Sequence, residues 1–276
     1  VWVRGLPPED PESPLHKFWL RREDMDMFLE MQREWVEEHG DPNYYLDFEA
    51  VVVPPPFADS LTFEPVESGL PDRGKWQMNL VVDDMNGDGV PDLVLPPMRK
   101  GVERPFIFLG KGQGRFEIWP ALRFAKDVPF DYGGIATADF NGDGHRDLAL
   151  AIHFKQQYVL YGDGAGAFTE SVKLPSPDPR ITSRAVSVAD FDGDGRPDLL
   201  FQAEIDYDLA TSARVTDRPT AWVVLNTAAG WQVLAEGMPT GVIGDRVQAA
   251  DFDGDGRTDI LTSSNTADYR KLLHLN

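Results

Sequence analysis

The chain has 276 residues, of which 42% are hydrophobic and 11% aromatic, so it is long enough to bury a sizeable core. Its 46 acidic against 26 basic residues give a formal net charge of −20, which disfavours nucleic acid and anionic membrane surfaces as partners. The absence of cysteine excludes disulfides, thiolate metal sites and a cysteine nucleophile. No apolar run reaches the length of a transmembrane segment.

Residues 1–56 differ in composition from the rest of the chain, and we predict that they form an N-terminal arm. Ser13 and Pro14 suit the cap and first turn of a helix, and apolar residues recur after them at helical spacing. We therefore predict an amphipathic helix over about 14–39, ended by Gly40. Its apolar face has two interpretations: packing within the protein, or docking onto a partner protein.

Residues 57–276 contain a nine-residue pattern, Asp-x-Asx-Gly-Asp-Gly-x-x-Asp, four times. The copies occupy residues 84–92, 139–147, 190–198 and 251–259, and their starts are 55, 51 and 61 residues apart. A period of this size is typical of stacked supersecondary units, as in propellers and solenoids.

Short strands are predicted around each copy from alternating or apolar runs. First strands are expected at 80–82, 135–138, 185–189 and 247–250, and second strands at 93–95, 148–150, 199–201 and 260–262. Third strands are expected at 106–109, 158–161, 222–226 and 272–276, and fourth strands at 115–118, 167–170 and 230–233. Four short antiparallel strands per unit predict an all-β fold, a β-propeller of four-stranded blades.

The last unit lacks a fourth strand, and residues 60–66 near the start of the repeats resemble one. Two interpretations stay open. Either this early strand completes the last blade and closes a small ring, which removes an exposed sheet edge, or further blades lie outside this chain.

The acidic pattern has the chemistry of a calcium site. Clustered carboxylates repel one another unless a cation lies among them, and oxygen ligands suit a hard cation such as Ca²⁺. Positions one, three, five and nine offer side-chain oxygens, position seven offers a backbone carbonyl, and glycines at four and six permit the tight bend. We predict up to four Ca²⁺ ions, with the first two sites weaker because an Asn stands at position three. The predicted ligands are Asp84, Asn86, Asp88, Val90 and Asp92; Asp139, Asn141, Asp143, His145 and Asp147; Asp190, Asp192, Asp194, Arg196 and Asp198; and Asp251, Asp253, Asp255, Arg257 and Asp259.

An EF-hand begins in a similar way but needs a bidentate Glu at position twelve and a helix on each side. Position twelve is occupied here by Leu95, Leu150, Phe201 and Thr262, and strand-forming residues flank each copy. The EF-hand interpretation is therefore excluded.

The run Ala-Asp-Phe-Asx-Gly-Asp-Gly-x-x-Asp-Leu, followed by a strand and a glycine-rich turn, resembles the FG-GAP/VCBS repeats of integrin-α-type β-propellers. The resemblance covers residues 57–276. It implies that each loop connects two strands of a blade and binds calcium, that the residue at position two packs near the blade, and that the module makes protein–protein or adhesive contacts. Propellers of this family usually have seven or eight blades, more than these residues supply.

The sequence contains no catalytic motif of a familiar kind, and its five histidines are scattered over different units. We predict a calcium-stabilised binding or assembly module outside the cytoplasm (secreted, periplasmic or at the cell surface), with protein partners, and not an enzyme. The alternative is a carbohydrate-active enzyme similar to polysaccharide lyases, or a glycan-binding protein. That alternative needs a His, Lys or Tyr base and an Arg converging on one face, and the sequence reveals no such cluster.

Overall fold

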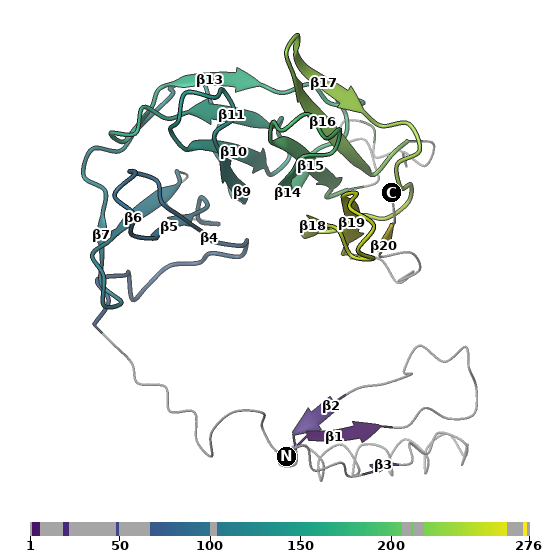
Figure 1. The fold of residues 1–276 in the computed structure, drawn as a ribbon, viewed down its shortest axis with the longest axis horizontal. Coiled ribbons are helices and arrows are strands. Elements are labelled where there is room, and N and C mark those ends of the chain that lie inside the picture. Colours follow the sequence, from purple (N-terminus) through teal and green to yellow (C-terminus); the bar gives the residue numbers. More distant parts are fainter. Residues whose placement is uncertain are drawn as a thin grey trace. The chain divides into compact units, whose positions relative to one another are not determined.

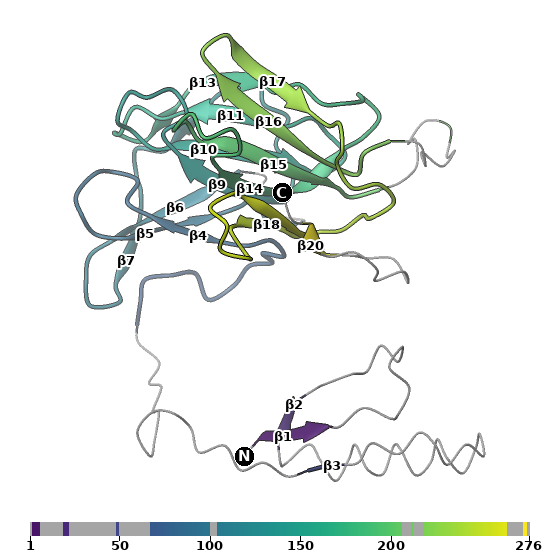
Figure 2. The ribbon, with the colours of Figure 1, turned by 45° about the vertical axis from the view of Figure 1, so that its right-hand side comes forward.

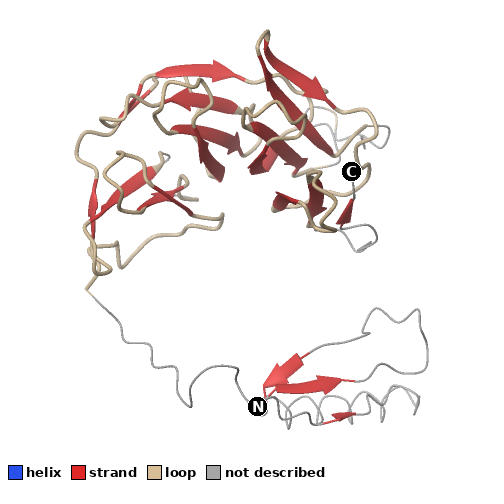
Figure 3. Ribbon diagram, viewed as in Figure 1, coloured by secondary structure: helices blue, strands red, loops and turns tan. Residues whose placement is uncertain are grey.

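The computed structural model describes residues 2–5, 19–21, 48–49, 67–99, 104–205, 211, 218–263 and 273–274. The chain divides into two compact units, Val1–Pro65 and Val66–Asn276. The predicted boundary after residue 56 and the predicted strand at 60–66 lie outside the described residues. Within the described residues the fold is all-β, with strands and loops and no helix (Figure 3).

The first unit contains a three-stranded antiparallel sheet in the order β2-β1-β3. Its strands are β1 (Trp2–Gly5), β2 (Trp19–Arg21) and β3 (Phe48–Glu49). The predicted helix over 14–39 is wrong at Trp19–Arg21, because this segment pairs with Trp2–Arg4 and its backbone hydrogen bonds go to another strand. The rest of that predicted helix lies outside the described residues.

The second unit consists mainly of four antiparallel sheets that follow one another in chain order (Figure 1). The first contains β4 (Val81–Asp83), β5 (Asp92–Leu95), β6 (Phe106–Gly110) and β7 (Phe116–Ile118). The second contains β9 (Gly133–Ala138), β10 (Asp147–Ile152), β11 (Tyr158–Tyr161) and β13 (Glu170–Lys173). The third contains β14 (Ser183–Ala189), β15 (Asp198–Ala203), β16 (Ala221–Thr227) and β17 (Gly230–Leu234). The fourth contains β18 (Val247–Ala250), β19 (Asp259–Thr262) and β20 (Leu273–His274).

One predicted strand is displaced. The fourth strand of the second sheet is β13, whereas the sequence placed it at 167–170. Residues Ala167–Phe168 form β12, which pairs in parallel with β8 (Arg123–Phe124). The reason is packing: Phe168 is buried in the core between the first two sheets, so the chain turns inward before it reaches the sheet edge.

Each junction between neighbouring sheets has its own apolar core. Strand β10 illustrates the pattern, since Leu148 and Leu150 face the core shared with the first sheet, while Ala149 and Ala151 face the core shared with the third. A smaller core joins the third and fourth sheets and includes Ile260. Successive side chains of β10 thus point to opposite faces of the sheet, as in any strand, and both of these faces are buried.

The two terminal sheets bury one face each within the described residues. On the first sheet Leu80, Val82 and Ile118 are 52%, 59% and 47% exposed, and on the fourth Leu273 is 46% exposed. Antiparallel sheets commonly pack one face and leave the other in solvent, but here the uncovered faces carry large apolar side chains. The first strands of neighbouring sheets contact one another, as β9 and β14 do in Figure 2.

Candidate functional site

All four acidic loops occupy the same position in their sheets. Each follows the first strand and leads into the second, which starts at the position-nine aspartate: Asp92, Asp147, Asp198 or Asp259. The four first strands jointly line one central cavity. Their corresponding ends meet: Thr137 near the end of β9 donates a hydrogen bond to Asp83 at the end of β4. Gly134 near the start of β9 lies against Arg184 near the start of β14, which pairs with Asp245 just before β18, so these strands run in the same direction. The loops at their ends therefore lie on one common face of the second unit.

The position-one aspartate holds the loop backbone in a tight curl. In the second loop, Asp139 Oδ1 accepts the N–H of Gly142 at 2.7 Å and Asp139 Oδ2 accepts the N–H of Gly144 at 2.8 Å. The corresponding bonds are present in the other three loops, with distances of 2.6–2.9 Å. Four copies of one sequence pattern thus adopt one geometry.

The paired glycines are required for their backbone conformation. Gly142 and Gly144 have φ angles of 75° and 88°, and their counterparts in the other loops are similar. A Cβ atom at either position would meet nothing within 4 Å, so space is not the constraint. The left-handed φ disfavours every residue with a Cβ, as the sequence predicted.

The position-nine aspartate is buried and joins three parts of the sheet. Asp147 is 0% exposed; its Oδ2 accepts the N–H of Phe140 and its Oδ1 the N–H of Gly162 in the turn after β11, both at 2.8 Å. Burial raises the pKa of Asp147 to about 6, and burial likewise raises the pKa of Asp92 and Asp198. Because burial disfavours the ionised form of these carboxylates, a nearby cation would stabilise that form.

Carboxylate oxygens converge in the third and fourth loops. One oxygen from each of Asp190, Asp192 and Asp194 lies within 4.8 Å of the others, and the same holds for Asp251, Asp253 and Asp259. In the first two loops the position-three amide faces the position-five carboxylate, with Asn86 Nδ2 donating to Asp88 at 3.0 Å and Asn141 Nδ2 to Asp143 at 2.9 Å. The carbonyl ligands assigned to Val90, His145, Arg196 and Arg257 stay predictions.

The sequence analysis missed one feature of the last two loops. The position-seven arginine folds back onto the position-five carboxylate: Arg196 pairs with Asp194, and Arg257 Nη2 lies 2.6 Å from Asp255 Oδ2. The hydrogen bond from the Arg257 side chain lowers the pKa of Asp255. These guanidinium groups partly neutralise the loops with the highest formal charge.

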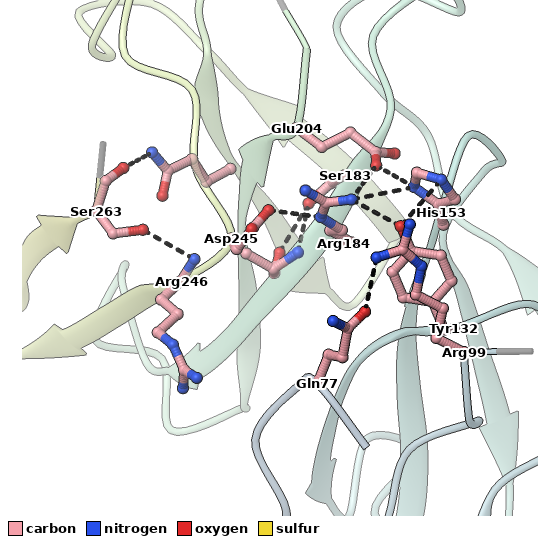
Figure 4. A network of polar contacts seen from close by, with 12 residues as sticks. Gln77, Arg99, Tyr132, His153, Ser183, Arg184, Glu204, Asp245, Arg246 and Ser263 are labelled. Carbon is pink, nitrogen blue, oxygen red and sulfur yellow. Dashed lines mark hydrogen bonds and ion pairs between the residues drawn. The ribbon is translucent and has the colours of Figure 1, made fainter. Parts of the chain in front are cut away.

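A second group of polar side chains lies at the other end of the strands (Figure 4). Tyr132 precedes β9, His153 follows β10, Arg184 lies in β14, Glu204 follows β15 and Asp245 precedes β18. The acidic loops join the opposite ends of these strands, so this cluster occupies the opposite face. We call it the Tyr132–Asp245 cluster.

Glu204 anchors the Tyr132–Asp245 cluster with a side chain that is 0% exposed. Its Oε2 lies 2.5 Å from His153 Nδ1 and 3.7 Å from Arg184 Nη1. Arg184 donates from Nε to Asp245 at 2.5 Å and from Nη1 to the Tyr132 hydroxyl at 2.9 Å, and that hydroxyl lies 3.1 Å from His153 Nε2. Nothing in the sequence signals this cluster beyond the position of each residue near a strand end, and the structure brings together a His, a Tyr and an Arg that the sequence did not reveal as neighbours.

Comparison with known proteins agrees with the repeat pattern. The model of the FG-GAP-like repeat matches residues 139–201, which run from the second acidic loop to β15. No curated protein matches the chain significantly. The match is consistent with an FG-GAP/VCBS repeat protein, and the repeated acidic loops and successive antiparallel sheets agree with it. FG-GAP repeats suggest a propeller-like module often involved in protein interactions, and they are typical of extracellular proteins. No helix among the described residues has the length and apolar character to cross a membrane.

Proposed function

We propose that the second unit is a calcium-binding β-propeller module that holds protein partners outside the cytoplasm. The observation that carries this proposal is the convergence of carboxylate oxygens in loops of one geometry on one face. Two oxygens bound to one Ca²⁺ at 2.3–2.6 Å lie at most about 5 Å apart. The 4.8 Å limit met by Asp190, Asp192 and Asp194 therefore fits a single ion.

The donor set fits calcium better than the softer transition metals. The predicted side-chain ligands are carboxylate and amide oxygens, with no thiolate and no imidazole among them, and hard oxygen donors suit Ca²⁺ or Mg²⁺. Ca²⁺ tolerates an irregular set of oxygen ligands such as these loops offer, whereas Mg²⁺ demands a nearly ideal octahedron. A bound ion would neutralise the repelling carboxylates and fasten the first strand of each sheet to the second.

The propeller arrangement is supported by the way in which neighbouring sheets are joined. Thr137 Oγ1 donates to Asp83 at 2.7 Å between the first and second sheets, and Thr258 Oγ1 donates to the carbonyl of Asp190 at 3.0 Å between the third and fourth. The exposed faces of the terminal sheets, with Val82 and Leu273, give this module apolar surface for assembly. Protein contact through the part of the predicted N-terminal helix that follows Arg21 is part of the same proposal.

We propose binding rather than catalysis. In the Tyr132–Asp245 cluster, the Tyr132 hydroxyl and both ring nitrogens of His153 are engaged by protein groups. The cluster nevertheless supplies the residue types that the carbohydrate alternative requires. Glycan recognition is therefore the second candidate function, and this cluster is the observation that favours it.

The metal proposal is tested by thermal unfolding of the full chain in excess EGTA and in millimolar CaCl₂, together with metal analysis of the dialysed protein. We expect calcium to raise the melting temperature, because an ion that binds the folded state alone stabilises it. MgCl₂ at the same concentration is the control and should act more weakly. Identical melting curves in EGTA and calcium would refute the proposal. Location is tested separately, by fractionating cells that produce the complete gene product.

A further inference from the structure

The Tyr132–Asp245 cluster is pre-organised by a buried carboxylate. Glu204 Oε2 lies 2.5 Å from His153 Nδ1, and Nε2 of the same ring lies 3.1 Å from the Tyr132 hydroxyl. Glu204 also accepts the N–H of Phe154 at 2.8 Å through Oε1. The buried Glu204 side chain thus orients His153, and through it Tyr132, and also holds the backbone at Phe154. Support of this kind from buried groups keeps a binding site rigid.

Exposed groups form a rim around these fixed ones. Phe154 follows His153 directly, is 41% exposed, and stacks on the His153 ring with centroids 3.8 Å apart. Its φ of 54° is rare for a residue with a bulky side chain. Backbone strain of this kind concentrates at functional sites, and here it holds an aromatic ring toward solvent.

An exposed arginine completes the rim. Arg99 lies over the face of Tyr132, with Cζ 5.4 Å from the ring centroid, and its Nη1 donates to Gln77 at 3.1 Å. Within the described part of the chain no carboxylate pairs with Arg99. The Arg99 guanidinium is held in place by the Tyr132 ring and the Gln77 amide, so it is available to bind an anionic group. This local positive charge stands out in a chain of net charge −20.

The central cavity adjoins this cluster. Its volume is about 220 Å³, and its lining includes Asp245, Arg246, Asn79, Thr137 and Ser187. Asp245 also receives the hydrogen bond from Arg184, so it connects the cavity with the cluster. Apolar residues such as Leu80, Ile135 and Val186 line the rest of the cavity. A space of this size, with both apolar and polar walls, suits one small ring that has an apolar face and a hydroxylated edge.

We propose that this face binds a short acidic oligosaccharide, with a sugar carboxylate at Arg99 and one sugar ring on Phe154. The proposal deepens the glycan-binding candidate above and is independent of calcium occupancy. The planar guanidinium of Arg99 pairs with the sugar carboxylate. The C–H groups on one face of the sugar ring carry partial positive charge, so they pack favourably on the negative face of the Phe154 ring. Among the residues that line the cavity, Asp245 and Ser187 offer hydrogen-bond partners to hydroxyl groups of the same or the next unit.

The observations favour a sugar over an acidic peptide as the ligand. A flat, rigid aromatic side chain beside several fixed polar groups matches a ring with one apolar face and a hydroxylated edge. A polyanion longer than a few sugar units is disfavoured as a ligand, because the protein's net charge of −20 repels its additional negative charges. The ligand is therefore short, with few negative charges.

The test is calorimetric titration of the full chain with trigalacturonate, its methyl ester and the peptide Glu-Glu-Glu. We expect trigalacturonate to bind, and the ester, which lacks the charge for Arg99, to bind at least about tenfold more weakly. The Arg99→Ala and Phe154→Gly variants should each weaken binding by about tenfold or more; glycine at 154 suits the positive φ. Lys111→Ala is the matched control, an exposed cation paired with Glu117 away from this face, and should bind as the parent does.

Absence of binding by trigalacturonate at millimolar concentration would overturn the proposal. So would equal affinity for the ester, tighter binding of the peptide, or equal affinities of the Arg99→Ala and Lys111→Ala variants, whose folding is checked by their melting temperatures. The titration is repeated in EGTA. Sugar binding by a chain whose melting is insensitive to calcium would refute the metal proposal alone, whereas calcium stabilisation without sugar binding would refute this one alone.

Discussion

Phe140, the second residue of the second acidic loop, packs against Trp231 of the next sheet, with ring centroids 5.8 Å apart. The carbonyl of Phe140 also accepts a hydrogen bond from Asn226 Nδ2 at 2.7 Å. The loop that carries the carboxylates therefore supplies part of the contact between neighbouring sheets. Phe252 holds the equivalent position in the fourth loop but is 44% exposed, because no following sheet covers it within the described residues.

This difference predicts unequal effects of two chemically identical substitutions. Phe140→Ala should lower the free energy of unfolding by about 3–4 kcal/mol, since a fully packed ring is lost, whereas Phe252→Ala should cost less than about 1 kcal/mol. Urea unfolding monitored by circular dichroism measures both. Equal losses would mean that another part of the protein covers Phe252.

Two aspartates of the same loop should behave differently when they are replaced. Asp147→Ala leaves the buried N–H groups of Phe140 and Gly162 without their acceptor, so we expect the free energy of unfolding to fall by about 2 kcal/mol already in EGTA, and further in calcium because a predicted ligand is lost. Asp143 is exposed, so Asp143→Ala should cost little in EGTA and should mainly reduce the stabilisation by calcium. Thermal unfolding in both media separates the two roles, and an unchanged calcium response in Asp143→Ala would remove that residue from the proposed ligands.

The position-three residue should set the strength of the first two sites. Replacing Asn141 by Asp adds one negative charge and removes the amide that now donates to Asp143. We expect the Asn141→Asp variant to bind calcium several-fold more tightly, because affinity rises with the number of charged ligands. Competition against a fluorescent chelator measures this change. Glu170→Gln, which changes an exposed acid of the same sheet outside the loop, is the control; weaker binding by Asn141→Asp would contradict the assignment of position three.

Glu204 should be important for stability. Glu204→Gln removes the charge that His153 and Arg184 share, and we expect a loss of about 1–3 kcal/mol because a buried charge-assisted network is broken. The matched control is Glu117→Gln, since Glu117 is 67% exposed and pairs with Lys111 at 3.6 Å. That exposed pair should contribute less than about 1 kcal/mol. Chemical denaturation compares them, and similar losses would show that Glu204 has no special role.

Local sequence patterns determined the loops and most of the strands. Each acidic loop is a chain of contacts between residues two to seven positions apart, such as Asp139 with Gly142 and Gly144, and its glycines need a conformation that the sequence alone signals. The alternation in β10 likewise follows from the pleat of a strand. Because these interactions join residues close together in the sequence, they form in the same way whatever the tertiary structure around them.

Tertiary structure decided what depends on distant partners. Trp19–Arg21 is a strand because Trp2–Arg4 is available to pair with it, and Ala167–Phe168 leaves the predicted strand because the core between two sheets accepts Phe168. Glu204 and His153 are 51 residues apart in the chain, yet they meet at 2.5 Å because neighbouring sheets pack side by side. No local sequence pattern predicts the contact between Glu204 and His153. It arises from the packing of whole sheets, and the spacing of these sheets along the chain is irregular.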